Sequence, residues 1–61
     1  MTKGYTVEII NPAEKKSVFL HFKEESAARD AMSGNQRCIL TEWAQFPDGL
    51  GDYEIELERN F

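Results

Sequence analysis

An acidic residue occupies every second position near the C-terminal end of this 61-residue chain. These residues, hereafter the acidic row, are Asp52, Glu54, Glu56 and Glu58. In a strand, alternate side chains share a face and lie roughly 7 Å apart, from a rise of about 3.3 Å per residue. Such a row can present negative charge to a basic protein surface or imitate a nucleic-acid backbone. It does not suit a metal ion, because side chains along one strand face diverge too far to surround a cation.

The acidic row also has a purely structural interpretation, in which charges on an outward strand face keep the protein soluble and discourage edge pairing. An aromatic anchor on the same open face would favour a role in binding. Trp43, with Ile39, Phe19 and Phe61, is the candidate aromatic patch, although Trp43 can equally belong to the core. The predicted partner-binding residues are Glu54, Glu56, Glu58, Asp52 and Trp43.

No catalytic, cofactor-binding or metal site is predicted. His21 is the only histidine, and no cluster of cysteines or further histidines accompanies it. Cys38 is followed by two aliphatic residues and is expected to be a buried hydrophobe. Lys15 and Lys16 are too few for a basic nucleic-acid patch. Residues 48–52 (DGLGD) lack the spacing of a calcium or phosphate-binding loop.

Composition indicates one folded domain over residues 1–61, with 41% hydrophobic and 30% charged residues. Residues 1–36 carry five bases and five acids, whereas residues 37–61 carry two bases and six acids. The second part therefore accounts for the whole net charge of −4. A chain this short has little room for a substrate pocket, and no nucleophile–base pair is visible, so we expect no enzyme.

The single cysteine excludes an intrachain disulfide and favours a reducing compartment. The residues after Met1 show no signal peptide, and no stretch approaches the roughly 20 apolar residues of a membrane span. The sequence therefore predicts a cytoplasmic protein without membrane association.

Apolar periodicity predicts strands over residues 5–10, 17–22, 36–46 and 52–59. The last segment alternates most clearly, with Tyr53, Ile55 and Leu57 inward and the acidic row outward. In residues 36–46, Glu42 interrupts the more apolar alternation, which indicates a bulge or a strand end near Thr41. The sequence leaves open which side of this segment faces the helix.

Residues 23–34 (KEESAARDAMSG) predict the only helix. Glu24 and Glu25 suit its first turn, and Glu25 can pair with Arg29 four residues later. Gly34 and Asn35 are expected to end it. Its apolar stripe is Ala27, Ala28, Ala31 and Met32.

The order strand-strand-helix-strand-strand predicts an α+β fold with two layers, a four-stranded, mostly antiparallel sheet with the helix across one face. We prefer a β-grasp-like order, in which the first and last strands pair in parallel at the centre. The alternative places the second strand at the centre.

The leading functional interpretation is a non-enzymatic protein-interaction module that docks on a larger, basic partner through the acidic row and its aromatic neighbours. A short acidic chain that begins with Met1 and carries no catalytic groups is similar in type to bacteriophage accessory proteins, which suggests an inhibitor or modulator. One alternative is a nucleic-acid-binding regulator using Lys3, Lys15, Lys16 and Arg37. Another is a self-associating structural protein, in which Phe19 or Trp43 closes a homodimer. No cofactor or small-molecule substrate is expected.

Overall fold

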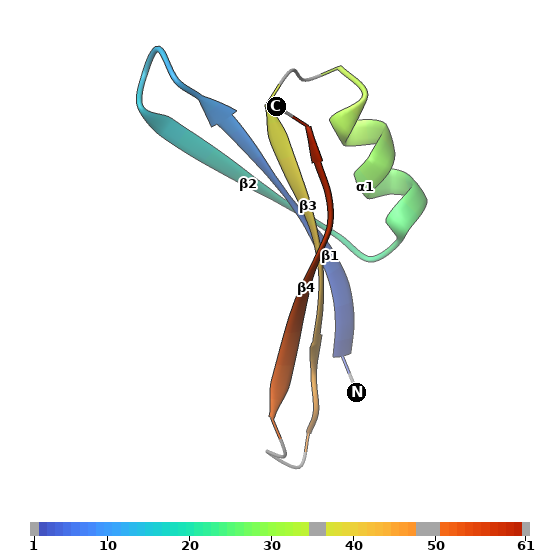
Figure 1. Ribbon diagram of the computed structural model, residues 1–61. Coiled ribbons are helices and arrows are strands. Elements are labelled where there is room, and N and C mark those ends of the chain that lie inside the picture. The colour runs from blue at the N-terminus through green and yellow to red at the C-terminus, as the bar shows by residue number, and fades with distance from the viewer. Residues whose placement is uncertain (1, 35–36, 48–50, 61) are drawn as a thin grey trace.

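The computed structural model describes residues 2–34, 37–47 and 51–60. Within these ranges, four strands form one antiparallel sheet, and one helix lies across one of its faces (Figure 1). The elements are β1 (Thr2–Asn11), β2 (Lys16–Phe22), α1 (Glu25–Met32), β3 (Cys38–Gln45) and β4 (Asp52–Asn60). The predicted α+β class, two layers and ββαββ order are confirmed.

The strands lie in the order β2-β1-β3-β4, and every neighbouring pair is antiparallel. The preferred β-grasp-like order is therefore wrong, because β1 pairs with β3 and not with β4. The alternative order is wrong as well, since β2 forms an edge of the sheet rather than its centre.

Burial explains why β3 rather than β4 lies beside β1. Cys38, Leu40 and Ala44 on β3 are completely buried, which requires a neighbouring strand on each side. β4 carries an acid at every second position, and such charge suits an edge because it discourages pairing with other chains. The clean alternation of β4 indicates one apolar face, and an edge strand has such a face as readily as a central strand does.

The core lies between α1 and the facing side of the sheet. Its buried members are Tyr5, Val7, Ala28, Met32, Cys38 and Leu40. β3 therefore presents Cys38, Leu40 and Ala44 toward the helix side. Cys38 is buried as predicted, and this burial raises the pKa of its thiol.

α1 is shorter than the predicted segment 23–34. It begins after Glu24, which has extended backbone angles and makes no side-chain capping hydrogen bond. It ends at Met32, where the hydroxyl of Ser33 donates to the backbone oxygen of Asp30 at 2.7 Å. Ala27 is exposed, contrary to the predicted stripe, and Asn35 lies outside the described residues. Among the described residues, no helix has the length and apolar character that crossing a membrane requires.

The short helix explains a second departure from the predicted pattern. α1 packs on β1, β2 and β3, whereas it meets β4 through the ion pair of Arg29 with Glu58 and does not cover it. Tyr53 is half-buried, but Ile55 and Leu57 remain 49% and 37% exposed, so their predicted inward position does not bury them.

The connection between β1 and β2 is an exposed turn over residues 12–15. The side-chain oxygen of Asn11 accepts hydrogen bonds from the backbone amides of Ala13 (3.1 Å) and Glu14 (3.3 Å). Lys15 then adopts a left-handed conformation with φ 54°. Asparagine commonly stabilises turns by this local hydrogen bonding.

Candidate functional site

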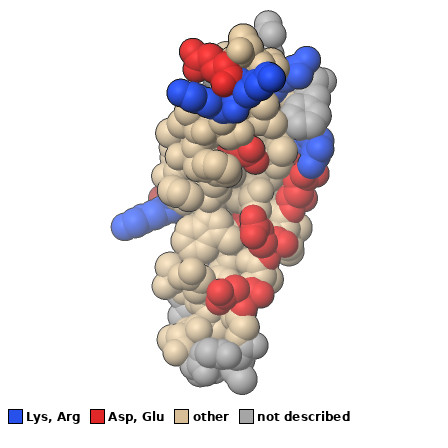
Figure 2. Space-filling model, turned by 90° about the vertical axis from the view of Figure 1, so that its left-hand side faces the viewer, with Lys and Arg blue, Asp and Glu red and all other residues tan. Residues whose placement is uncertain are grey.

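The sheet face that points away from α1 has no element over it within the described residues (Figure 1). We call it the open face. Cross-strand partners project from the same side of a sheet, so the pairing register assigns its residues. They include Thr6, Phe19, His21, Ile39, Trp43, Asp52, Glu54 and Glu56. Figure 2 shows this side of the molecule, where acidic side chains follow one another beside a broad uncharged surface.

Trp43 lies on the open face and not in the core cluster. Its indole rests against Gly4 of β1, where an added Cβ would overlap the ring carbon Cζ2 and stand 2.8 Å from Cε2. The indole Nε1–H donates to Oγ1 of Thr6 at 3.0 Å. A glycine and a hydroxyl on β1 thus hold the half-buried indole against the sheet.

His21 extends this arrangement onto β2. Its Nδ1 lies 2.8 Å from Oγ1 of Thr6. Because the Thr6 oxygen already accepts from Trp43, its own proton is available to the imidazole nitrogen. Trp43, Thr6 and His21 therefore form a hydrogen-bonded chain across three strands. The described residues contain no group of three or more His, Cys, Asp or Glu side chains suited to a metal ion.

Two shallow hollows flank the indole of Trp43, and Trp43 and His21 line both. The first, of about 350 Å³, also includes Thr6, Gln45, Asp52, Tyr53 and Glu54 in its lining. The second, of about 400 Å³, includes Thr2, Lys3, Gly4, Phe22 and Lys23. One side of the indole is thus acidic and the other basic.

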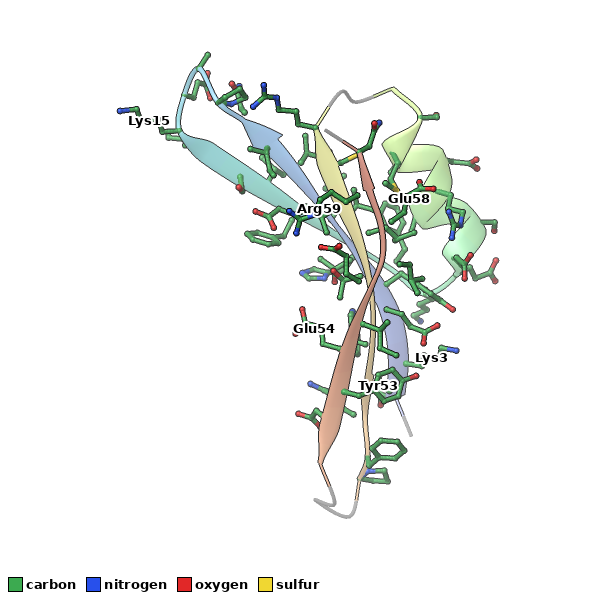
Figure 3. All side chains as sticks on the ribbon, viewed as in Figure 1. Lys3, Lys15, Tyr53, Glu54, Glu58 and Arg59 are labelled. Carbon is green, nitrogen blue, oxygen red and sulfur yellow. The ribbon has the colours of Figure 1, made fainter. Side chains whose placement is uncertain are left out.

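The acidic row is divided between the two faces of the sheet. The β3–β4 register shifts between Leu40 and Thr41, which pair with Glu58 and Glu56 respectively, so Leu57 is an extra residue in β4. The bulge or strand end predicted within residues 36–46 is therefore wrong for β3, which pairs regularly with β1 from Cys38 to Gln45; the extra residue lies in β4, opposite Leu40 and Thr41. Because a bulge reverses the side on which later residues project, Glu58 lies on the helix side. Figure 3 shows Glu54 on the open side of β4 and Glu58 toward α1.

The prediction that all four acids share one face is therefore wrong for Glu58. Its carboxylate lies 3.5 Å from the guanidinium of Arg29 on α1. Glu56 is on the open face but is bound by Arg59, whose Nη2 lies 2.6 Å from Oε1. Asp52 and Glu54 make no ion pair with any residue that the structure describes. Glu54 pairs directly with Trp43 in the strand register.

The predicted aromatic patch is only partly assembled. Phe19 is 57% exposed on the open face, and Ile39 lies on the same face. Both are cross-strand neighbours of Glu8, whereas Trp43 lies four residues along β3 from Ile39, roughly 13 Å away at about 3.3 Å per residue. Phe61 lies outside the described residues.

Glu42, the charge that interrupts the apolar side of β3, has partners on the helix side. Its carboxylate lies 3.2 Å from Nζ of Lys3 and accepts a hydrogen bond from the hydroxyl of Tyr53 at 3.1 Å. The hydrogen bond with Lys3 lowers the pKa of Glu42 and raises the pKa of Lys3. Burial and the hydrogen bond to Glu42 raise the pKa of Tyr53.

Among the bases considered for nucleic-acid binding, Lys3 lies apart from Lys15. Lys15 lies at the tip of the β1–β2 hairpin, whereas Lys3 lies at the far end of the sheet on the helix side (Figure 3). Lys3 is also engaged with Glu42.

Sequence reasoning identified Trp43 and Glu54 but not Gly4, Thr6 or the place of His21 beside the indole. The alternation of polar and apolar residues in β1 and β2 places Thr6 and His21 on the outward side of their strands. This alternation could have indicated that both residues lie on the same face as Trp43. No protein-family model, curated protein sequence or solved structure matches this chain, so the functional inference rests on its own residues.

Proposed function

We propose that this protein is a non-enzymatic binding module whose open face docks on a basic surface of a larger protein. One observation carries the proposal: Trp43, held flat by Gly4 and Thr6, lies on an uncovered sheet face directly opposite Glu54, whose carboxylate forms no ion pair with the described residues.

The chemistry of this face suits a cationic partner. Tryptophan is a frequent energetic centre of protein interfaces, and its ring face attracts the cationic groups of lysine and arginine. Asp52 and Glu54 line the hollow beside the indole, where their carboxylates can pair with the same lysine or arginine of the partner. The fixed indole loses little conformational entropy on binding, so the partner meets a preorganised surface.

The proposal includes a cytoplasmic setting and a modulating role of the phage accessory type, in which docking blocks or alters the partner without chemistry. Cys38 is buried without a disulfide partner, which suits a reducing compartment. The open face extends over several strands, which suits contact with a broad protein surface rather than enclosure of a small molecule.

The division of the acidic row provides a matched test. Glu54→Lys/Glu56→Lys reverses two charges on the open face. Glu14→Lys/Glu58→Lys reverses two exposed charges in the β1–β2 turn and on the helix side. Each pair moves the net charge from −4 to zero, so the two variants differ in the placement of charge and not in its amount.

Each protein is used to capture partners from cell lysate, and the captured proteins are identified by mass spectrometry. We expect a partner that wild type and the Glu14/Glu58 variant recover and that the Glu54/Glu56 variant and Trp43→Ala lose. Circular dichroism should show the same secondary structure for all four proteins. A partner retained by the Glu54/Glu56 variant and by Trp43→Ala would refute docking through the open face.

A further inference from the structure

β2 is an edge strand with one lysine, Lys16 at its first position, and so has less charge than the opposite edge. Residues 17–22 (SVFLHF) contain no acidic, lysine or arginine residue, and Val18 and Phe19 are 56% and 57% exposed. β4, the other edge, carries four acids and Arg59. Natural sheets protect exposed edges with charge or cover them, because free backbone groups and apolar side chains recruit another strand.

We propose that β2 pairs antiparallel with β2 of a second copy of this chain, which joins two four-stranded sheets into one sheet of eight strands. The two-fold axis passes through Leu20, perpendicular to the sheet. In Figure 1, β2 lies along one side of the sheet with its outer edge directed away from the other strands. That edge is accessible to a partner strand within the described part of the chain.

Charge complementarity selects this register. With Leu20 opposite itself, Val18 faces Phe22 of the second copy, so apolar side chains meet on the helix side, and Phe19 faces the imidazole of His21 on the open face. Lys16, the first residue of β2, then comes level with Glu24, an exposed residue two positions beyond the end of β2, where the chain bends into α1. Centring the pair on Phe19 would instead place Lys15 opposite Lys23 and leave Lys16 opposite Phe22.

Two copies of β4 would pair far less favourably. An antiparallel pair of β4 strands brings their alternating acids close together, and like charges on neighbouring strands are destabilising. The second copy is therefore the occupant that fits the β2 edge. The perpendicular axis leaves both open faces uncovered on the same side, so this pairing is independent of the proposed docking through Trp43.

A comparison of the two edges tests the proposal by sedimentation equilibrium from micromolar to millimolar concentration. Val18→Lys introduces a charge on β2, and Ile55→Lys does the same at a similarly exposed position on β4. We expect wild type and Ile55→Lys to form dimers with similar affinity and Val18→Lys to associate at least roughly tenfold more weakly. A wild type that stays monomeric, or dimers lost by Ile55→Lys and retained by Val18→Lys, would overturn it.

A charge exchange between Lys16 and Glu24 tests the register of the pairing. Because both residues are exposed, these variants are expected to fold even if Val18→Lys does not, so they also test the dimer itself. Lys16→Glu and Glu24→Lys should each weaken the dimer roughly tenfold, because each creates two like-charge pairs across the two-fold axis. Lys16→Glu/Glu24→Lys should restore the affinity to within about twofold of wild type. A double variant as weak as the single variants would overturn the Leu20-centred pairing.

Discussion

Gly4 and Trp43 lie far apart in the sequence, yet each determines how the other can be placed. The indole occupies the space that a Cβ would fill at Gly4, so a side chain at this position and a flat Trp43 exclude each other. Thr6 fixes the orientation of the indole ring, because its hydroxyl oxygen accepts a hydrogen bond from the indole N–H. The geometry of the open face therefore depends on the smallest residue in the sheet.

Replacing Gly4 with alanine should displace Trp43 and destabilise the fold by about 1–3 kcal/mol, as overpacking does elsewhere. Trp43 is the only tryptophan, so its fluorescence reports the displacement directly. We expect a red-shifted emission maximum and a lower melting temperature. Gly34→Ala is the control, because nothing lies within 4 Å of an added Cβ at Gly34. A Gly4→Ala protein with unchanged emission would show that the indole is not held in this way.

The Lys3–Glu42–Tyr53 cluster should make stability depend on acidity in a defined direction. Contact with Lys3 holds the pKa of Glu42 below its usual 4.5, so its stabilisation is complete above that pH and is lost as pH falls through the folded value. Glu42→Gln should therefore lower the melting temperature at neutral pH, and the difference from wild type should close in acid.

Lys3→Met provides the linked control for that measurement. Without its partner, Glu42 loses the main cause of its lowered pKa, so Glu42→Gln in this background should have a smaller, less pH-dependent effect. The raised pKa of Lys3 acts in the opposite direction, since its stabilisation is present below 10.5 and is lost as pH rises through the folded value. A difference between wild type and Glu42→Gln that is constant with pH would contradict the role of this ion pair.

At the scale of elements, the β1–β2 turn contains the one non-glycine residue with positive φ in the described part of the chain, Lys15 at 54°. Residues other than glycine, asparagine and aspartate adopt this conformation at a cost in free energy. Lys15→Gly should raise stability by up to about 1 kcal/mol, the relief of strain exceeding the entropy that glycine loses. Lys16→Gly, in β2, should instead lower it by roughly 0.5–1 kcal/mol. Urea unfolding of the two variants checks both signs, and a destabilised Lys15→Gly protein would exclude strain at this position.

The sequence predicted the elements of this fold better than their arrangement. The burial of Cys38 followed from its aliphatic neighbours, but the charge of Glu42 wrongly indicated a bulge or strand end in β3, whereas the bulge lies in β4. The strand order did not follow, because the pairing of β1 with β3 rather than β4 depends on burial on both sides of β3. The position of Glu58 depends on that same bulge, which adds a residue to β4 and reverses its side. The strand order and the side of Glu58 depend on pairing between strands that are distant in the sequence, so no local sequence pattern predicts them.

At the scale of the whole molecule, the domain is long and thin, with principal extents of 41 × 23 × 14 Å. A domain of about 60 residues buries only about 60% of the surface that its unfolded chain exposes, which makes it marginally stable alone. Here the helix leaves apolar residues exposed on both edge strands, among them Val18 on β2 and Ile55 on β4. Association is one means by which small domains gain the missing burial.

If the β2 edges pair as proposed, thermal stability should depend on protein concentration. Dimer formation adds its association free energy to the folded state and not to the unfolded chain, so dilution lowers the melting temperature by mass action. We expect wild type and Ile55→Lys to melt at higher temperature as concentration rises, whereas the melting temperature of Val18→Lys should rise less over the same range. Differential scanning calorimetry over a hundredfold range of concentration measures this dependence. Concentration-independent melting of wild type would mean that the exposed β2 edge is tolerated in the monomer, and that the packing between α1 and the sheet suffices for folding.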